Sequence, residues 1–206
     1  MSETASPSSP ANSQLVYTLR SVLWPFDLAD LFVRPQPLEV ELGCGDASFL
    51  LNYAQANPQR NFIGVERLLG RVNKIHRKGV RLGLTNIRGV RIESSYFLRY
   101  LLPKRSAQAL HIYFPDPWPK LKHRRHRLIN DAFPGLARAA LLDGGVVYLR
   151  TDDLDYFRQM QRVFAADPGY VEEATPAELL AFKTDFEAEF NARGIPTQHA
   201  AYRLVR

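Results

Sequence analysis

One carboxylate in this chain stands in a stiff turn, directly before a dense group of cations. Residues 114–127 read Phe-Pro-Asp-Pro-Trp-Pro-Lys-Leu-Lys-His-Arg-Arg-His-Arg, so Asp116 lies between two prolines and seven Lys, Arg or His residues follow between 120 and 127. Proline restricts the backbone, and a carboxylate held in this way can orient a ligand or stabilise a developing positive charge. The cations that follow are typical of a surface that binds phosphate groups.

Further acids lie at similar places in the chain, at or just beyond the ends of predicted strands. Apolar runs predict five strands, at 38–43, 61–66, 86–93, 107–114 and 145–151. The acids are Glu41, Glu66, Glu93, Asp116 and Asp152. Ligands of doubly wound sheets bind outside the carboxyl ends of the strands, so this set predicts an acidic binding site. For Glu93 and Asp152, a role as a helix N-cap is the alternative.

The loop after the first predicted strand contains Gly43 and Gly45, which allow a tight turn and the close approach of a ligand. The dinucleotide fingerprint requires a glycine where Ser48 stands, so a cofactor without a pyrophosphate is favoured. Glu66 lies about 20 residues beyond the loop, where an acid can accept hydrogen bonds from both ribose hydroxyls. Together with the neighbouring acids, the loop predicts S-adenosylmethionine, whose sulfonium favours an acidic pocket.

Helices and strands alternate along the chain. Helices are predicted at 47–56, 68–82, 95–102, 125–141 and 154–165, and the last part adds strands near 169–173 and 197–205 and helices near 176–181 and 184–193. This pattern predicts an α/β, Rossmann-like fold with a mostly parallel seven-stranded sheet and helices on both faces. Without an internal repeat or linker, residues 15–206 are expected to form a single domain, and the Ser- and Pro-rich residues 1–14 a disordered tail.

Composition and charge narrow the classes of partner. The chain has 206 residues, 46% of them hydrophobic and 23% charged, as in ordinary globular proteins. No apolar run approaches the roughly 20 residues needed to span a bilayer, and the single cysteine, Cys44, fits a reducing cytoplasm. We expect no membrane partner and no metal. Residues 67–127 hold 16 Lys and Arg against two acids, whereas the net charge of the whole chain is +6, which predicts a polyanionic partner.

Taken in order, the motifs are similar to those of one known family. They are Glu41-Leu-Gly-x-Gly, Gly64-Val-Glu66, Phe114-Pro-Asp-Pro-Trp-Pro-Lys120, the basic run 122–127, Thr151-Asp152 and Thr184-Asp-Phe-Glu187. Over residues 38–206 the chain resembles the bacterial tRNA (guanine(46)-N7)-methyltransferases, which have the class I S-adenosylmethionine-dependent fold. The resemblance implies methyl transfer from S-adenosylmethionine to N7 of guanosine 46, in the variable loop of tRNA.

The resemblance also implies roles for individual residues. The cofactor site would contain Glu41, Gly43, Gly45, Glu66, Glu93 and Asp116. The substrate would contact Lys120, Asp152, Thr184, Asp185, Phe186 and Glu187, and the tRNA would contact Lys122, His123, Arg124, Arg125, His126 and Arg127. Three positions depart from the family pattern, because members often carry Gly at Ala47, Asp or Asn at Glu93, and Lys at Asp185.

The chemistry of guanine N7 requires little of a protein. N7 carries an in-plane lone pair and no hydrogen, so it can attack a methyl sulfonium without a general base, and catalysis depends on alignment. We therefore interpret Asp116 as a catalytic residue that orients the guanine and stabilises the positive charge formed on it. Trp118 could stack on a flipped base or pack at the sheet edge. The alternatives are an RNA-binding protein on a methyltransferase scaffold without catalysis, and a methyltransferase of this fold with another substrate.

Overall fold

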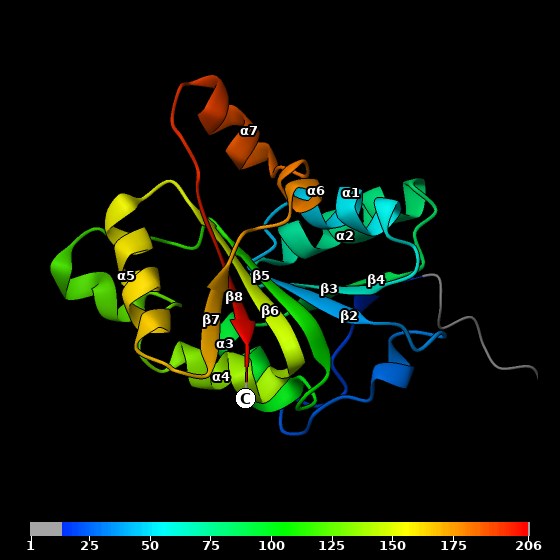
Figure 1. Ribbon diagram of the computed structural model, residues 1–206. Helices are drawn as coiled ribbons and strands as arrows, with labels where there is room; N and C mark the ends of the chain where they lie inside the picture. The colour runs from blue at the N-terminus through cyan, green and yellow to red at the C-terminus, as the bar shows by residue number, and fades with distance from the viewer. Residues whose placement is uncertain (1–13, 206) are drawn as a thin grey trace, which may run out of the picture.

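The computed structural model describes residues 14–205. The expected disordered tail at 1–14 lies outside these residues, apart from Gln14. The described chain forms one eight-stranded sheet in the order β1-β4-β3-β2-β5-β6-β8-β7 (Figure 1). The strands are β1 Val16–Tyr17, β2 Leu38–Leu42, β3 Asn61–Glu66, β4 Ile87–Arg91, β5 Ala107–Tyr113, β6 Leu141–Thr151, β7 Tyr170–Glu173 and β8 Gln198–Leu204.

The first six strands are parallel, and β8 runs antiparallel to β6 and to β7. The order of strands reverses beside β2, which pairs with β3 on one side and with β5 on the other. A mostly parallel Rossmann-like sheet is thus confirmed, but the expected number of seven strands is wrong. The additional strand is β1, whose two residues pair with Gly89 and Val90 of β4. A two-residue strand is too short to show the alternation from which a strand is predicted.

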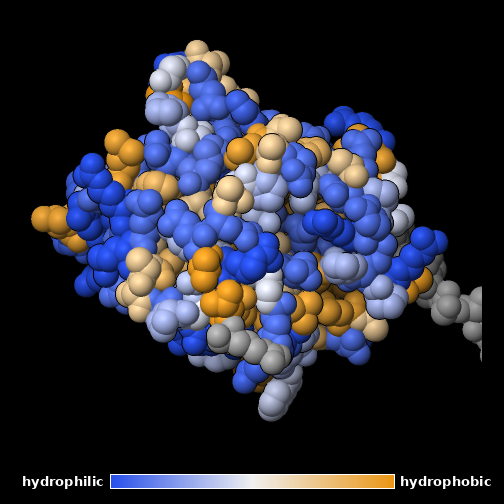
Figure 2. All heavy atoms as spheres, viewed as in Figure 1, coloured by the Kyte–Doolittle hydropathy of each residue, from blue (hydrophilic) through white to orange (hydrophobic). Residues whose placement is uncertain are grey.

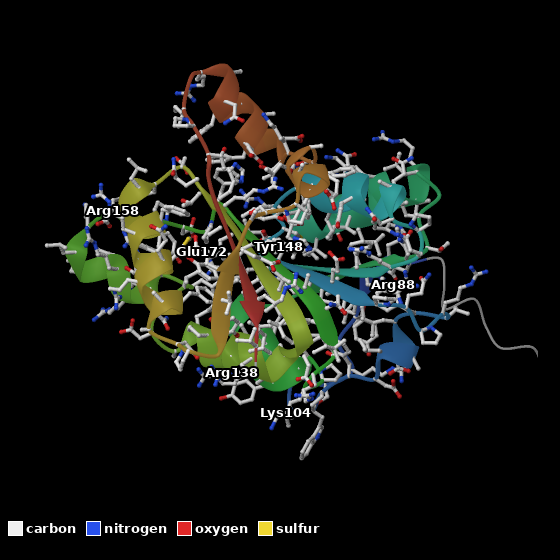
Figure 3. The ribbon with its side chains drawn as sticks, in the orientation of Figure 1. Arg88, Lys104, Arg138, Tyr148, Arg158 and Glu172 are labelled. Atoms are coloured by element: carbon white, nitrogen blue, oxygen red, sulfur yellow. The ribbon has the colours of Figure 1, made fainter. Side chains whose placement is uncertain are left out.

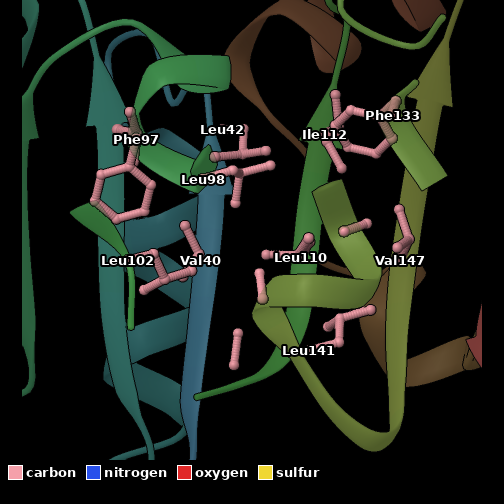
Figure 4. Close-up of a cluster of buried hydrophobic side chains, with 14 of the residues drawn as sticks. Val40, Leu42, Phe97, Leu98, Leu102, Leu110, Ile112, Phe133, Leu141 and Val147 are labelled. Atoms are coloured by element: carbon pink, nitrogen blue, oxygen red, sulfur yellow. The ribbon is translucent and has the colours of Figure 1, made fainter. Parts of the chain in front are cut away.

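Helices cover both faces of the sheet (Figure 1). One face carries α1 Ser48–Ala56 and α2 Leu69–Arg81, and the other carries α3 Ser94–Tyr96, the π-helical turn η2 Phe97–Leu101, α4 Phe133–Ala140 and α5 Leu154–Ala165. Each face has its own apolar core. Figure 4 shows part of the second core, where Val40, Leu110 and Val147 of the sheet lie near Phe97 and Phe133. No helix in residues 14–205 has the length and apolar character needed to cross a membrane.

The expected helix at 125–141 is wrong in its first half. The segment begins with the 3₁₀ helix η3 Leu121–His126 and continues without regular structure until α4, which carries Pro134 in its first turn. Proline is favoured at the start of a helix and breaks its interior, so Pro134 starts a helix here instead of bending one. The remaining short elements are η1 Leu28–Asp30, α6 Ala177–Leu180 and α7 Asp185–Ala192. Both α6 and α7 lie beyond the upper edge of the sheet in Figure 1.

Candidate active site

The loop between β2 and α1 forms the centre of the site. Gly43, Gly45 and Ala47 all have left-handed backbone angles, with φ of 78°, 55° and 62°. The backbone N–H groups of Gly43 and Cys44 donate to the Val65 carbonyl at 2.8 and 3.0 Å, which holds the loop against β3. A Cβ atom added at Gly43 or Gly45 would meet no atom within 4 Å. The glycines are therefore required for the turn, and the space above the loop is open to a ligand.

Glu66, at the end of β3, joins this loop to the start of α2. Its Oε2 accepts a hydrogen bond from the Gly45 N–H at 3.1 Å, and its Oε1 accepts one from the Leu68 N–H at 2.8 Å. The guanidinium of Arg71 lies 3.8 Å from Oε2. Each carboxylate oxygen can accept more than one hydrogen bond. Glu66 can therefore support the loop and still receive the ribose hydroxyls for which the sequence predicts it.

Glu41 lies in β2 just below the glycine loop and is 2% exposed. Its Oε2 is buried without a hydrogen-bond partner among the described residues. Burial raises the pKa of this carboxyl well above its usual range; Arg150 opposes the shift, and Asp46 and Glu66 add to it. A buried acceptor of this kind fits a positively charged ligand, which would supply the missing donor. The predicted cofactor, with its sulfonium and ammonium groups, therefore suits the residues that are present.

The two acids with an alternative N-cap interpretation behave differently. Glu93 does cap α3, since its carboxylate oxygens accept from the Ser95 and Tyr96 N–H groups at 2.9 and 2.8 Å. Its contact with the cofactor stays a prediction. At the start of α5 the cap is Asp153, whose Oδ1 accepts from the Tyr156 N–H at 2.7 Å. Asp152 is therefore not needed as the cap and remains a candidate for substrate binding.

The turn that follows β5 carries Asp116 at the surface. Phe114 lies two residues before Asp116, and Trp118 lies two residues after it. Both have left-handed φ values, of 50° and 45°. Such values are unusual for side chains of this size, and strained residues of this kind cluster at functional sites. The Phe114 N–H donates to the Arg150 carbonyl at 2.8 Å, which fixes the first of them to β6. Asp116 is thus presented at the same sheet edge as the glycine loop.

The basic run forms η3 beside α5. Lys120, Lys122, Arg125 and His126 are exposed, and His123 and Arg124 are half-buried. Trp118 stacks on His123, with ring centres 5.9 Å apart and an angle of 4° between the planes, and lies 5.2 Å from His126. Arg158 points outward from α5 on the same flank (Figure 3). This flank is mainly hydrophilic in Figure 2, as a phosphate-binding surface would be.

The expectation that Arg127 contacts tRNA is wrong. Its side chain is 1% exposed and points inward, where Nη2 donates to Asp155 Oδ2 at 2.7 Å and Nη1 to Gln159 Oε1 at 2.8 Å. Nε donates to the Pro117 carbonyl at 2.6 Å. A guanidinium that is enclosed and engaged in this way is not available to a phosphate group. Contacts of the other five residues of the run with tRNA stay predictions.

The segment Thr184–Glu187 begins α7 and lies against the glycine loop. Thr184 caps α7 by accepting from the Glu187 N–H at 2.9 Å, and the Asp185 N–H donates to Ser48 Oγ at 2.8 Å. The Phe186 ring is 5.0 Å from the Phe114 ring, so the segment also reaches the turn that carries Asp116. The structure therefore brings together a loop, a turn and a helix start that lie far apart in the sequence.

Glu187, predicted to contact the substrate, is engaged in a buried ion pair, and its contact with the substrate stays a prediction. It is 1% exposed, and its Oε2 accepts from Arg150 Nη1 at 2.9 Å. Arg150 also donates to the Leu179 and Phe182 carbonyls, each at 2.7 Å, so it holds the α6–α7 segment on the sheet. Sequence reasoning missed this residue. The signal in the sequence is Arg150 itself, a cation inside the apolar run 145–151. A cation at such a buried position is expected to have a partner of opposite charge.

Asp46 is a second residue that sequence reasoning missed. Its carboxyl shares a hydrogen bond with that of Asp185, and Lys78 lies 3.8 Å from it. Partial burial and then this hydrogen bond raise the pKa of Asp185. The pKa of Asp46 is lowered in spite of its burial, because it accepts the hydrogen bond and lies near Lys78. Within the described residues, no three metal-binding side chains lie close enough to hold a metal ion.

Comparison with known proteins gives the relationship of the chain. A family model described as "Putative methyltransferase" matches residues 35–204. The tRNA (guanine-N(7)-)-methyltransferase of Geobacter metallireducens is 37% identical over 152 residues, which cover 74% of this chain and 72% of that protein. The protein of the same name from Chromohalobacter salexigens is 35% identical over 181 residues, which cover 86% of this chain and 74% of that protein. This chain belongs to the tRNA (guanine-N7)-methyltransferase family.

The solved structures agree with this family at the level of the fold. A 30S ribosomal A1408 methyltransferase from an uncultured bacterium matches with a TM-score of 0.59 and 16% identity, over 89% of this chain and 98% of that one. The acids of the glycine loop and the Asp116 turn lie at one edge of the sheet, and their roles in binding cofactor and substrate stay predictions. In this family member the site also includes the buried Arg150 and the pair Asp46 and Asp185.

Proposed function

We propose that this protein transfers the methyl group of S-adenosylmethionine to N7 of a guanosine in tRNA, at position 46 of the variable loop. The relatives that carry this name support the reaction. One observation carries the assignment of the site: the buried Oε2 of Glu41, which has no hydrogen-bond partner among the described residues, lies beneath the glycine loop, at the sheet edge that also presents Asp116. We further propose that residues 15–206 act as a single catalytic domain in the cytoplasm.

The bound cofactor supplies an electrophilic methyl group next to its positive charge. Its sulfonium would keep the electron pair of the C–S bond when guanine N7 takes the methyl group, so the positive charge would then reside on the purine. Asp116 accepts hydrogen bonds from the N–H groups of the guanine and stabilises the charge that forms on it. The prolines on either side restrict its backbone, so alignment is retained throughout the step.

Two cationic surfaces are proposed to bind the tRNA backbone on either side of the site. The first is η3, with its exposed Lys122, Arg125 and His126. The second is formed by Arg67, which precedes α2, and by Arg71 and Arg81 of α2, all three of them exposed. In Figure 1, α2 lies on the opposite side of the molecule from α5. Because A-form RNA hides its base edges in a deep groove, these surfaces recognise the shape of the tRNA and present one accessible nucleotide to Asp116.

The test uses purified protein, labelled S-adenosylmethionine and unmodified tRNA, followed by mapping of the product through the alkali-labile scission at N7-methylguanosine. We expect label in tRNA and a single scission at position 46. Asp116→Ala should lower turnover far more than tRNA affinity, whereas Arg124→Ala with Arg125→Ala should mainly weaken tRNA binding. Scission at another guanosine would refute the position. Bound cofactor without label in tRNA would favour the non-catalytic RNA-binding alternative, which the names of the relatives do not favour.

A further inference from the structure

The turn that carries Asp116 has few means of holding its own shape. Three of its six residues, 114–119, are prolines, which have no backbone N–H to donate. Phe114 and Trp118 are held at left-handed φ of 50° and 45°, a conformation that persists only where surrounding contacts impose it. The bond from the Phe114 N–H to Arg150 fixes the beginning of the turn. A separate contact is needed to fix the part beyond Asp116.

Arg127 supplies that contact. Its Nε donates to the carbonyl of Pro117, the residue directly after Asp116, at 2.6 Å. Its two terminal nitrogens are fixed on α5 by Asp155 and Gln159, at 2.7 and 2.8 Å. The guanidinium carbon also lies 4.7 Å from the centre of the Tyr156 ring. The turn is thus attached to a helix of the core through one buried side chain.

The geometry requires an arginine. The planar guanidinium directs its N–H groups to three acceptors at once, and a lysine ammonium, which is a compact point charge, cannot span them. We propose that Arg127 is a positioning residue of the methyl transfer: it sets the position of the Asp116 carboxylate by holding the Pro117 carbonyl, and it does not bind RNA. The proposal rests on the proposed function, since it assigns Asp116 the role described there.

The experiment compares Arg127→Lys with Arg162→Lys, the same change at an exposed arginine of α5 whose one ion pair among residues 14–205 is with Asp131. For Arg127→Lys we expect kcat to fall about 10- to 100-fold, the loss typical of a misplaced group. KM for tRNA, its salt dependence and the affinity for S-adenosylmethionine should remain within about twofold. Arg162→Lys should leave all four quantities unchanged.

A double variant separates positioning from a general effect on folding. If Arg127 acts through Asp116, then adding Arg127→Lys to Asp116→Ala should lower kcat by no more than about twofold beyond Asp116→Ala alone. Asp155→Asn removes the charge of one anchor of Arg127 at an exposed position, which weakens the anchor, and should show the same pattern with a smaller loss. If the loss of kcat in the double variant equalled the product of the two single losses, the proposal would be overturned. A raised KM for tRNA and a weaker salt dependence, with kcat unchanged, would also overturn it and make Arg127 an RNA contact.

A second readout does not depend on catalysis. In a Trp24→Phe background, Trp118 is the single tryptophan and lies in the turn itself. Arg127→Lys should make its fluorescence more accessible to acrylamide, and Arg162→Lys should not. Equal quenching in both variants would refute the anchoring. If the wild-type protein failed to methylate tRNA, the proposed function would fall, while this measurement would still show whether Arg127 holds the turn.

Discussion

Glu41 is expected to lower the stability of the protein without its cofactor and to be necessary for cofactor binding. The residue is 2% exposed and its Oε2 has no partner among the described residues. Glu41→Gln keeps the shape of the side chain and removes the charge. We therefore expect the variant to unfold at a higher temperature than the wild type in the absence of ligand, and to bind S-adenosylmethionine more weakly.

The magnitudes follow from the burial of a charge without a partner, because the glutamine amide is also unpartnered but carries no charge. Leaving such a group without a partner costs about 1–3 kcal/mol, and for a chain of this length each kcal/mol shifts Tm by about 2–4 °C. The variant should therefore gain about 2–12 °C in Tm. A hydrogen bond between charged partners contributes about 1.5–3 kcal/mol, so the loss of cofactor affinity should be about 10- to 150-fold.

The effect of pH has a definite sign. The pKa of Glu41 is raised in the folded protein, so the protonated form is favoured there. Its contribution to stability is fully present below the pKa of the unfolded state, about 4.3, and is lost as the pH rises through the higher pKa of the folded state. The Tm advantage of Glu41→Gln should therefore be largest at neutral pH and should shrink as the pH approaches 4.

Thermal unfolding between pH 4 and 8 and calorimetric titration with S-adenosylmethionine measure both effects. Titration with S-adenosylhomocysteine, which lacks the sulfonium charge, identifies the group that Glu41 meets. An equal loss for both ligands indicates the ammonium, and a loss for S-adenosylmethionine alone indicates the sulfonium. A lower Tm for the ligand-free variant at neutral pH, or an unchanged affinity for both ligands, would refute the reasoning.

Three further perturbations test neighbouring parts of the site. Asp185→Asn should raise Tm near neutral pH and lose this advantage in acid, because the raised pKa of Asp185 makes its charged form unfavourable beside Asp46; an advantage in acid alone would contradict this. Ala47→Gly should change the free energy of unfolding, measured with urea, by less than about 1 kcal/mol. Glycine relieves the left-handed strain, but it loses more conformational entropy on folding and removes a buried methyl group. Lys122→Gln with Arg125→Gln should reduce the slope of log K against log salt for tRNA, measured by anisotropy, by about 1–2; an unchanged slope would exclude η3 from the interface.

Sequence patterns predicted those parts of the fold that depend on local spacing. The apolar stripe of α2 predicted a helix over 68–82, and the helix spans Leu69–Arg81. The glycine loop and the acids at the strand ends were located by the same means, because the carboxyl ends of parallel strands meet at one edge. The chain thus carries its fold and the outline of its site in short-range patterns.

Long-range contacts explain what the sequence patterns did not show. A run of cations does not reveal which side chain turns inward, and Arg127 does so because Asp155 and Gln159, 28 and 32 residues later, receive it on α5. Glu187 is buried for the same reason, since its partner Arg150 lies 37 residues away on β6. Both residues belong to contacts between elements, and such contacts have no signature in the spacing of a single segment.

The two departures from the family pattern at Ala47 and Asp185 concern the same junction. Ala47 holds the left-handed position that glycine would adopt without strain, and its neighbour Asp46 shares a hydrogen bond with Asp185 at the start of α7. A lysine at 185 would form an ion pair with Asp46. Here the cation beside Asp46 is Lys78 of α2, at 3.8 Å, and two carboxyl groups meet across the junction. One of them must carry a proton for the bond to exist, so this side-chain contact depends on protonation, whereas the bond from the Asp185 N–H to Ser48 Oγ does not.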